Sequence, residues 1–183
     1  MPVPPDDQLA ELGRVVTLAA LLEWDLAVLI AQLTPLSEDE SMELLKHRPS
    51  LIRKLKESVE EFEQKVDKFR GKVGKREASE HRFLLHDKFI ADVESAFAER
   101  DRVAHGIYLL GNGKFVMFHP RSREAFELNV KELNEISTKI DMLSVTTFSM
   151  VATINSRKSE MLITDPTFDG SISVPKKEES IGN

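Results

Sequence analysis

The sequence predicts an all-α fold, a helical bundle with a small β-hairpin inserted before the last long helix. Apolar residues recur every three or four positions over several long stretches, which is the spacing of one helix face. One segment, 107–118, departs from this period. It places short apolar runs on both sides of an Asn-Gly pair, a strong hairpin signal because both turn positions favour positive φ. At 183 residues the chain is long enough for one domain with a sizeable core.

The first half of the chain is expected to form three helices. The first spans about 7–33 and carries a broad apolar stripe, and a Thr-Pro pair ends it. Ser37 and Glu40 have the spacing of a capping box, in which the two side chains satisfy each other's backbone donors at a helix start. The second helix, which they begin, is expected to end near Pro49. The third spans about 50–69 with a clean amphipathic pattern.

The second half is expected to hold a fourth helix, the hairpin and a last long helix. The fourth helix spans about 79–104, and Gly106 supplies a stop. The hairpin over 107–118 follows, and it should lie against the helices because a lone hairpin is marginal in water. The last helix spans about 130–154, where apolar residues again hold one face.

Both ends of the chain have the composition of unstructured segments. Residues 1–6 are rich in proline and read as a short disordered leader. Residues 161–183 shift towards Asp, Pro, Gly, Ser, Lys and Glu, which predicts a flexible tail. The folded domain is therefore expected over 7–160.

The composition indicates the cellular compartment of the protein and excludes several kinds of functional site. The chain has no cysteine, so it has no disulfide, thiolate metal site or cysteine nucleophile, which fits a reducing cytoplasm.

No basic segment precedes an apolar run, as one would in a secretory signal. The most apolar stretch is interrupted by acids before it reaches the roughly 20 residues of a membrane span, so no membrane association is expected. A net charge of −6 argues against coating long nucleic acid, but leaves room for an RNA enzyme with a local basic patch.

The sharpest functional signal is the run RDRVAHG at 100–106, at the end of the fourth helix. Arg100 continues a buried stripe after Phe97, where an arginine is uncommon without a partner. Asp101 lies four residues before His105, so the two can face each other across one turn. Histidine transfers protons near neutral pH and a guanidinium braces phosphate, so these parts suffice for transesterification of RNA without a metal.

The spacing within this run limits how Arg100 and His105 can act together. Arg100 and His105 are five residues apart, hence about 140° apart on an ideal helix. The two side chains converge on one phosphate only if the helix loosens at its end or if two copies combine across a dimer.

The pattern of Arg100, four intervening residues and His105, with Asp101 after the arginine, resembles the R-x(4–6)-H motif of the HEPN superfamily. The resemblance implies a helical, metal-independent endoribonuclease of toxin–antitoxin or antiphage defence. Arg100 and His105 would be catalytic, and Asp101 would orient or stabilise them, although asparagine is commoner in the family at that position. It also implies a homodimer with the two motifs at a shared cleft, and an antitoxin protein would be a further partner. The expected products carry a 2′,3′-cyclic phosphate and a 5′-hydroxyl.

Other basic residues close to the motif are candidates for RNA binding. They are Arg102, His119, Arg121 and Arg123. Contact of the last three with RNA phosphate and a plain solvated loop are equally compatible with the sequence.

Neither a metal nor a cofactor is expected. His81 and His86 are five residues apart, not the three or four that place two ligands on one helix face. We therefore expect surface histidines and no zinc site.

Two other interpretations fit the motif residues. In a structural one, Arg102 and His105 cap the helix C-terminus and Arg100 pairs with an acid such as Glu23. In a functional one, the chain is a non-catalytic helical module whose apolar groove binds a partner protein or its own copy.

Overall fold

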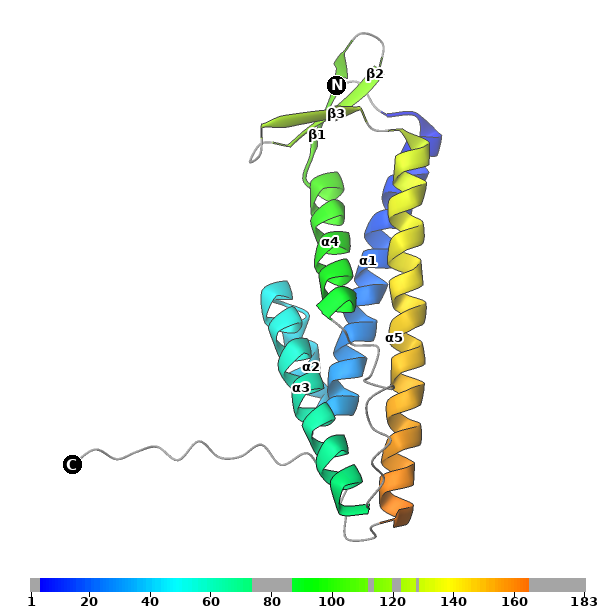
Figure 1. Cartoon of the computed structure of the whole chain (residues 1–183). Helices are drawn as coiled ribbons and strands as arrows, with labels where there is room; N and C mark the ends of the chain where they lie inside the picture. Colours follow the sequence, from blue (N-terminus) through cyan, green and yellow to red (C-terminus); the bar gives the residue numbers. More distant parts are fainter. Residues whose placement is uncertain (1–3, 74–86, 112–113, 120–122, 128, 165–183) are drawn as a thin grey trace, which may run out of the picture.

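The computed structural model describes residues 4–73, 87–111, 114–119, 123–127 and 129–164. Its elements, in chain order, are α1 (Asp6–Leu33), α2 (Glu38–Leu44), α3 (Arg48–Val73), α4 (Asp87–Ala104), β1 (Ile107–Gly111), β2 (Lys114–His119), β3 (Glu124–Glu127) and α5 (Val130–Thr164). The mainly helical fold with a β-hairpin before the last helix is confirmed. Helices α1 and α5 run side by side in the same direction, α4 runs the opposite way, and the sheet lies where α4 ends (Figure 1).

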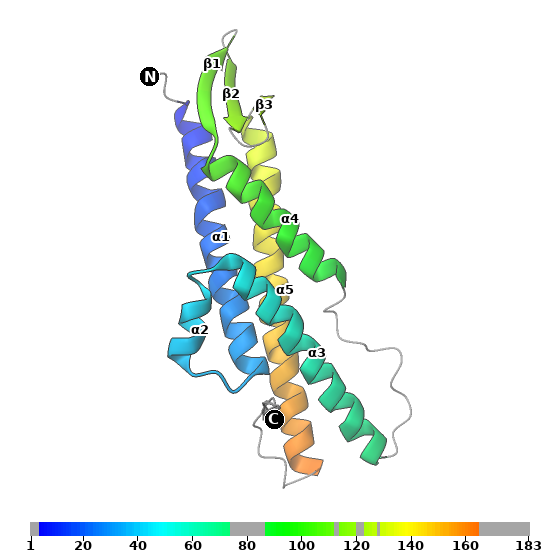
Figure 2. The same cartoon turned by 90° about the vertical axis from the view of Figure 1, so that its left-hand side faces the viewer.

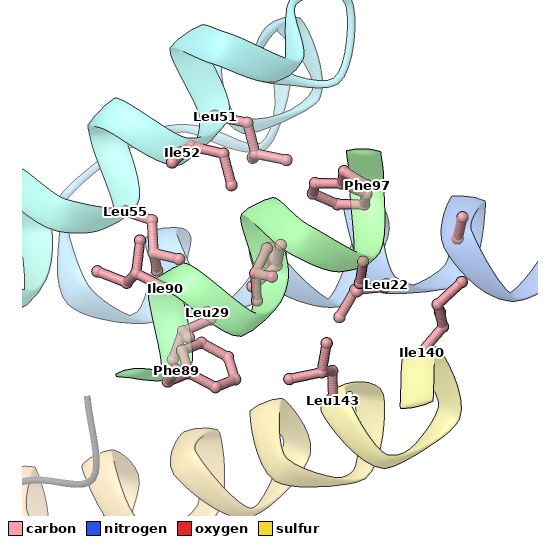
Figure 3. Packing of buried hydrophobic residues seen from close by; sticks show 14 of the residues in the cluster. Leu22, Leu29, Leu51, Ile52, Leu55, Phe89, Ile90, Phe97, Ile140 and Leu143 are labelled. Carbon is pink, nitrogen blue, oxygen red and sulfur yellow. The ribbon is translucent and has the colours of Figure 1, made fainter. Parts of the chain in front are cut away.

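Helix α1 is the centre of the bundle and packs against each of the other four helices. Its apolar stripe is buried from Val15 to Leu33. Figure 3 shows how Leu22 and Leu29 of α1 meet apolar side chains from α3, α4 and α5. Of the helices in the described part of the chain, α1 alone is long and apolar enough to cross a membrane. A buried core helix has the same character, so this indication is weak.

The start of α2 follows the predicted capping box. The Glu40 carboxylate accepts a hydrogen bond from the Ser37 backbone N–H (2.9 Å), and the Glu40 N–H donates to Ser37 Oγ (3.3 Å). However, α2 ends at Leu44, earlier than expected, and α3 begins at Arg48. Pro49 therefore opens the third helix instead of closing the second, because a first-turn residue needs no intrahelical donor.

The β-hairpin is larger than the sequence predicts. Strands β1 and β2 pair antiparallel with Gly111 opposite Lys114, and the two residues between them lie outside the described part. A third strand, β3, pairs with β2 and was not expected. It has four residues with a glutamate at each end, so its local pattern carries little strand preference, and it is stabilised by pairing along β2.

Gly106 joins α4 to the sheet at a point of close packing. A Cβ at this position would lie 2.2 Å from Cγ and 2.4 Å from Sδ of Met117, a fully buried residue of β2. The glycine thus does more than stop the helix. It also lets β2 approach the end of α4 closely enough to cover it.

Helix α5 extends beyond its predicted end. It begins with the Asn129 side chain accepting a hydrogen bond from the Glu132 N–H (2.8 Å) and runs to Thr164. Residues 161–164, expected to start the flexible tail, therefore belong to the helix. The apolar periodicity stops after Ile154, so the pattern gave no sign of this continuation. The remainder of the tail and residues 1–3 of the leader lie outside the described residues, as does the 79–86 segment of the fourth helix.

Candidate functional site

The first five residues of the motif, 100–104, form the end of α4, and His105 and Gly106 follow the helix directly. The His105 backbone N–H donates to the Asp101 carbonyl (3.0 Å), an ordinary α-helical hydrogen bond. Although α4 ends at Ala104, this bond keeps the His105 backbone close to its helical position. The directions of Arg100 and His105 stay about 140° apart, and one chain alone does not bring the two side chains onto one phosphate.

Asp101 lies in a network of ions that joins three helices. Its carboxylate accepts hydrogen bonds from Arg48 Nη1 (2.7 Å to each oxygen) and from Arg100 Nη1 (2.9 Å). Arg48 Nε also donates to Glu23 Oε1 of α1 (2.7 Å). Glu23 thus binds Arg48, not Arg100, and the expected pair of Arg100 with Glu23 is wrong. We call Glu23, Arg48, Asp101 and Arg100 the four-ion network.

Electrostatics keep this network ionised. Burial disfavours the Asp101 carboxylate, but hydrogen bonds from Arg48 and Arg100 outweigh it and lower the pKa of Asp101 below its ordinary value. Burial likewise opposes the Arg48 charge, yet bonds to Asp101 and Glu23 raise the pKa of Arg48. The Arg48 guanidinium also lies 4.9 Å from the centre of the Phe97 ring. Asp101 is therefore a carboxylate at neutral pH and can position cations, but cannot donate a proton.

Arg100 lies at the edge of the core, as its position in the apolar stripe predicts. Its side chain is 19% exposed, and its Nε is buried without a hydrogen-bond partner among the described residues. A buried guanidinium N–H that lacks an acceptor raises the free energy of the folded state. The same donor is available to an incoming anion, and guanidinium geometry suits phosphate.

His105 is exposed, and within the described part of the chain its side chain makes no hydrogen bond or ion pair. The expected pairing of His105 with Asp101 is therefore not formed, because Arg48 and Arg100 occupy the carboxylate. Both residues still lie on one side of α4, about 40° apart by helical spacing. The imidazole is thus accessible on the same face as Asp101.

A groove of about 550 Å³ runs between α3 and α4 along this face. Its α3 wall carries Arg48, Arg53 and Lys56, and its α4 wall includes Glu94 and Asp101. Lys56 pairs with Glu94 (3.2 Å) and Arg48 is held in the four-ion network, whereas Arg53 is exposed. The groove thus presents a cationic wall next to the motif, on a chain that is acidic overall.

The strand register brings Arg123 to the same end of α4. Ile107 pairs with Phe118, and His119 pairs with Glu124, so the end of β2 and the start of β3 lie where β1 leaves α4. Arg123 is exposed just before β3, with a positive φ of 58°. Its neighbour Arg121 and the His119 side chain lie outside the described residues.

Arg102, the remaining candidate, lies in the last turn of α4 and is partly exposed. By helical spacing it points about 100° away from Asp101. It therefore does not face the groove.

Sequence reasoning missed Arg48, which holds the network together. The signal for it was the Arg-Pro pair at 48–49, which is as typical of a helix start as of a helix end. Read as a start, it would have placed an arginine on the first turn of α3. Even so, its partners lie 25 and 53 residues away, and no local pattern identifies them.

No metal site is formed by the described residues, in which no group of three or more His, Cys, Asp or Glu side chains could hold an ion. His81 and His86 lie outside that part. No family model, no curated protein and no solved structure matches the chain.

Proposed function

We propose that this protein is a metal-independent endoribonuclease of the HEPN type, acting in the cytoplasm in toxin–antitoxin or antiphage defence. The observation that supports it most is the arrangement at the end of α4. Arg100 has a buried donor without an acceptor among the described residues, His105 is accessible, and exposed Arg123 lies just before β3 at the same end. A phosphate-binding cation and a proton-transfer group are the parts this chemistry needs.

The reaction in this proposal is attack of an RNA 2′-hydroxyl on the adjacent phosphorus. The 2′-oxygen–phosphorus bond forms, the bond from phosphorus to the 5′-oxygen breaks, and the leaving oxygen takes a proton. His105 transfers protons as general acid or base, and Arg100 stabilises the charge on the phosphoryl oxygens. Asp101 holds the guanidiniums of Arg100 and Arg48 in place, a role that replaces the expected one of orienting His105.

The α3–α4 groove gives the RNA strand a path to the motif. Arg53 is exposed on its wall, and Arg123 lies just before β3, close to where β1 leaves α4. Cations along such a path neutralise backbone phosphates and make the affinity for RNA fall with added salt.

A dimer is part of the same proposal. Because Arg100 and His105 diverge on the intact helix, the catalytic pair combines Arg100 of one chain with His105 of a second at a shared cleft. This predicts that a mixture of inactive Arg100→Ala and inactive His105→Ala proteins regains part of the activity, since mixed dimers contain one complete pair. A mixture as inactive as its components contradicts the composite site.

The experiment that tests the nuclease uses purified protein, total RNA and EDTA. Wild type is expected to cleave in the presence of chelator, and both Arg100→Ala and His105→Ala are expected to lose cleavage while keeping a wild-type circular dichroism spectrum. Exposed Arg14 and His47 provide matched controls, and Arg14→Ala and His47→Ala should cleave like wild type. Cleavage that survives in both motif variants contradicts the proposal.

A second candidate is the non-catalytic interaction module. It is favoured by large apolar side chains that stay exposed where α1 and α5 lie side by side, among them Leu21, Trp24, Val28, Val145 and Phe148. We call this surface the α1–α5 face. A wild-type protein that self-associates but never cleaves RNA would support the module over the nuclease.

A further inference from the structure

The α3–α4 groove meets the motif at a negative charge. Of the motif residues, all of which the structure describes, Asp101 alone lines the groove, and Arg100 and His105 do not. Figure 2 shows this side of the molecule, with α3 and α4 in front and α5 behind them. An RNA strand in the groove therefore reaches the motif at a carboxylate, which repels phosphate. A cation at this point is needed if the groove is to lead RNA to the motif.

Each acid that lines the α4 wall of the groove is matched by a cation from the α3 wall. Lys56 Nζ lies 3.2 Å from Glu94 Oε1, and Arg48 Nη1 lies 2.7 Å from both oxygens of Asp101. Arg53 on the α3 wall is exposed and has no such acid beside it among the described residues. The lining of the groove is thus positive overall, although the chain has a net charge of −6.

Arg48 keeps a donor after it has bound its two acids. Its Nε donates to Glu23 and its Nη1 donates to Asp101. Its Nη2 donates to none of the described residues and, unlike Nε of Arg100, it is not buried. Nη2 is therefore accessible to a ligand on a side chain that lines the groove. A guanidinium N–H of this kind binds a phosphate oxygen through a charge-assisted hydrogen bond.

The Arg48 side chain is also held in one place. Glu23 and Asp101 bind it from two different helices, and its guanidinium lies 4.9 Å from the centre of the Phe97 ring. A side chain that is already immobilised loses little conformational entropy when it binds a ligand. The Arg48 side chain is 23% exposed, so a phosphate bound to it is partly shielded from water.

We infer that Arg48 binds a backbone phosphate of an RNA strand in the α3–α4 groove, next to the phosphate held by Arg100. The inference rests on the proposed function, because RNA is the ligand of that site. Arg48 and Arg100 donate to the same oxygen, Asp101 Oδ1, at 2.7 and 2.9 Å. The two guanidiniums are therefore close neighbours, as two phosphates of one strand require. By helical spacing Asp101 points about 40° from His105, so a cation bound to Asp101 extends the phosphate-binding surface towards His105.

A purely structural role for Arg48 makes a different prediction. In that case Arg48 affects RNA only by holding the four-ion network together, and any change that weakens the network also weakens RNA binding. Glu23→Gln is such a change, since it removes the charge of one acid bound to Arg48 and leaves Arg48 in place. If Arg48 contacts phosphate, Glu23→Gln leaves RNA binding unchanged or makes it tighter, because a nearby negative charge is lost.

The test measures binding of an RNA oligonucleotide to the full chain carrying His105→Ala, which removes the proton-transfer group so that bound RNA stays intact. Fluorescence anisotropy in EDTA gives the dissociation constant at several salt concentrations. Adding Arg48→Ala should raise this constant about tenfold and lower the salt slope of the affinity by about 1. Arg48→Lys keeps the charge but loses the fork, so it should bind about threefold more weakly with an unchanged slope.

Controls separate a lost phosphate contact from lost folding. Circular dichroism checks that each variant folds, and if Arg48→Ala does not, Arg48→Lys and Glu23→Gln decide the question. Arg14→Ala, at a half-exposed arginine of α1, should bind RNA like its parent. The inference is overturned if folded Arg48 variants keep the parent's affinity, or if Glu23→Gln weakens binding as much as Arg48→Lys does. A poly-glutamate peptide that binds as tightly as RNA would assign the groove to an acidic protein and also overturn it.

Binding and cleavage together separate this inference from the nuclease proposal. Weaker binding by the Arg48 variants, with no cleavage of RNA by wild type, refutes the nuclease and leaves the Arg48 contact standing. Cleavage by wild type, with binding unchanged in the Arg48 variants, refutes the contact and leaves the nuclease standing. Absence of RNA binding by the His105→Ala protein refutes the contact, whatever the wild type cleaves.

Discussion

At the scale of single residues, the arrangement at the end of α4 is determined by the partner that each charged side chain binds. Asp101 faces Arg48 and Arg100, so its negative charge is committed to two cations. His105, one turn later, is exposed. Only the direction of the Asp101 side chain separates this arrangement from the expected Asp101–His105 pair, and both are compatible with the same helical spacing. The difference arises because Arg48, from another helix, competes for the carboxylate.

Asp101→Asn should make the protein less stable at neutral pH but not at low pH. The lowered folded-state pKa of Asp101 means that its contribution is present above the unfolded pKa of about 3.9 and is lost as the pH falls through the folded value. Because the side chain is partly exposed, we expect a difference of only about 1 kcal/mol at pH 7. Urea unfolding at several pH values checks this. A difference that does not shrink on acidification contradicts the ion-pair account.

Gly106→Ala should destabilise the protein by about 1–3 kcal/mol, since the added methyl group would displace the buried Met117 side chain. Gly13→Ala is the matched control. Gly13 lies inside α1 with nothing within 4 Å of the added Cβ, so the same substitution should stabilise by about 0.5–1 kcal/mol. Thermal or urea unfolding of both variants measures the two shifts. Equal shifts of the same sign would refute the close-packing role of Gly106.

At the scale of elements, the four-ion network links α1, α3 and α4 near the motif. Arg48 provides the link with one side chain that reaches Glu23 on one helix and Asp101 on another. The guanidinium suits this because its fork presents Nε and Nη1 in different directions. An ammonium has no such fork, so the position favours arginine over lysine.

Arg48→Ala should destabilise the protein by about 2–4 kcal/mol, because Glu23 and Asp101 lose their shared counter-ion while partly buried. Arg48→Lys should recover only part of that loss. Arg53→Ala, in the same groove but exposed, should change the free energy of unfolding by less than about 0.5 kcal/mol. Urea unfolding ranks the three variants. An Arg48→Ala protein as stable as Arg53→Ala would mean that the network contributes nothing to the packing of α3.

The elements that the sequence predicted well are those whose burial follows a regular period. The first helix and the capping box at Ser37 appear as expected, because their signals are local. The third strand, the start of α3 at Arg48 and the continuation of α5 past Ile154 were missed. Each of these features either depends on contacts with residues far along the chain or lacks the apolar stripe from which a helix is predicted. The motif residues were found from spacing, but Arg48, their partner, was not.

At the scale of the whole molecule, two features lie on different sides of the bundle. The α3–α4 groove carries cations and reaches Asp101 of the motif, while the α1–α5 face exposes large apolar side chains. A nuclease needs the first to meet RNA, and an interaction module would use the second to bind its partner. The nuclease therefore predicts RNA cleavage, whereas the interaction module predicts association without cleavage.

The most direct test of the nuclease is the chemistry of the RNA ends that the wild-type protein produces in EDTA. Attack by the 2′-hydroxyl predicts fragments with a 2′,3′-cyclic phosphate and a 5′-hydroxyl, absent when Arg100→Ala or His105→Ala replaces wild type. End-labelling with polynucleotide kinase and mass spectrometry of the fragments identify both groups. Fragments ending in a 3′-hydroxyl and a 5′-phosphate, or intact RNA after incubation with folded wild-type protein, would contradict the account.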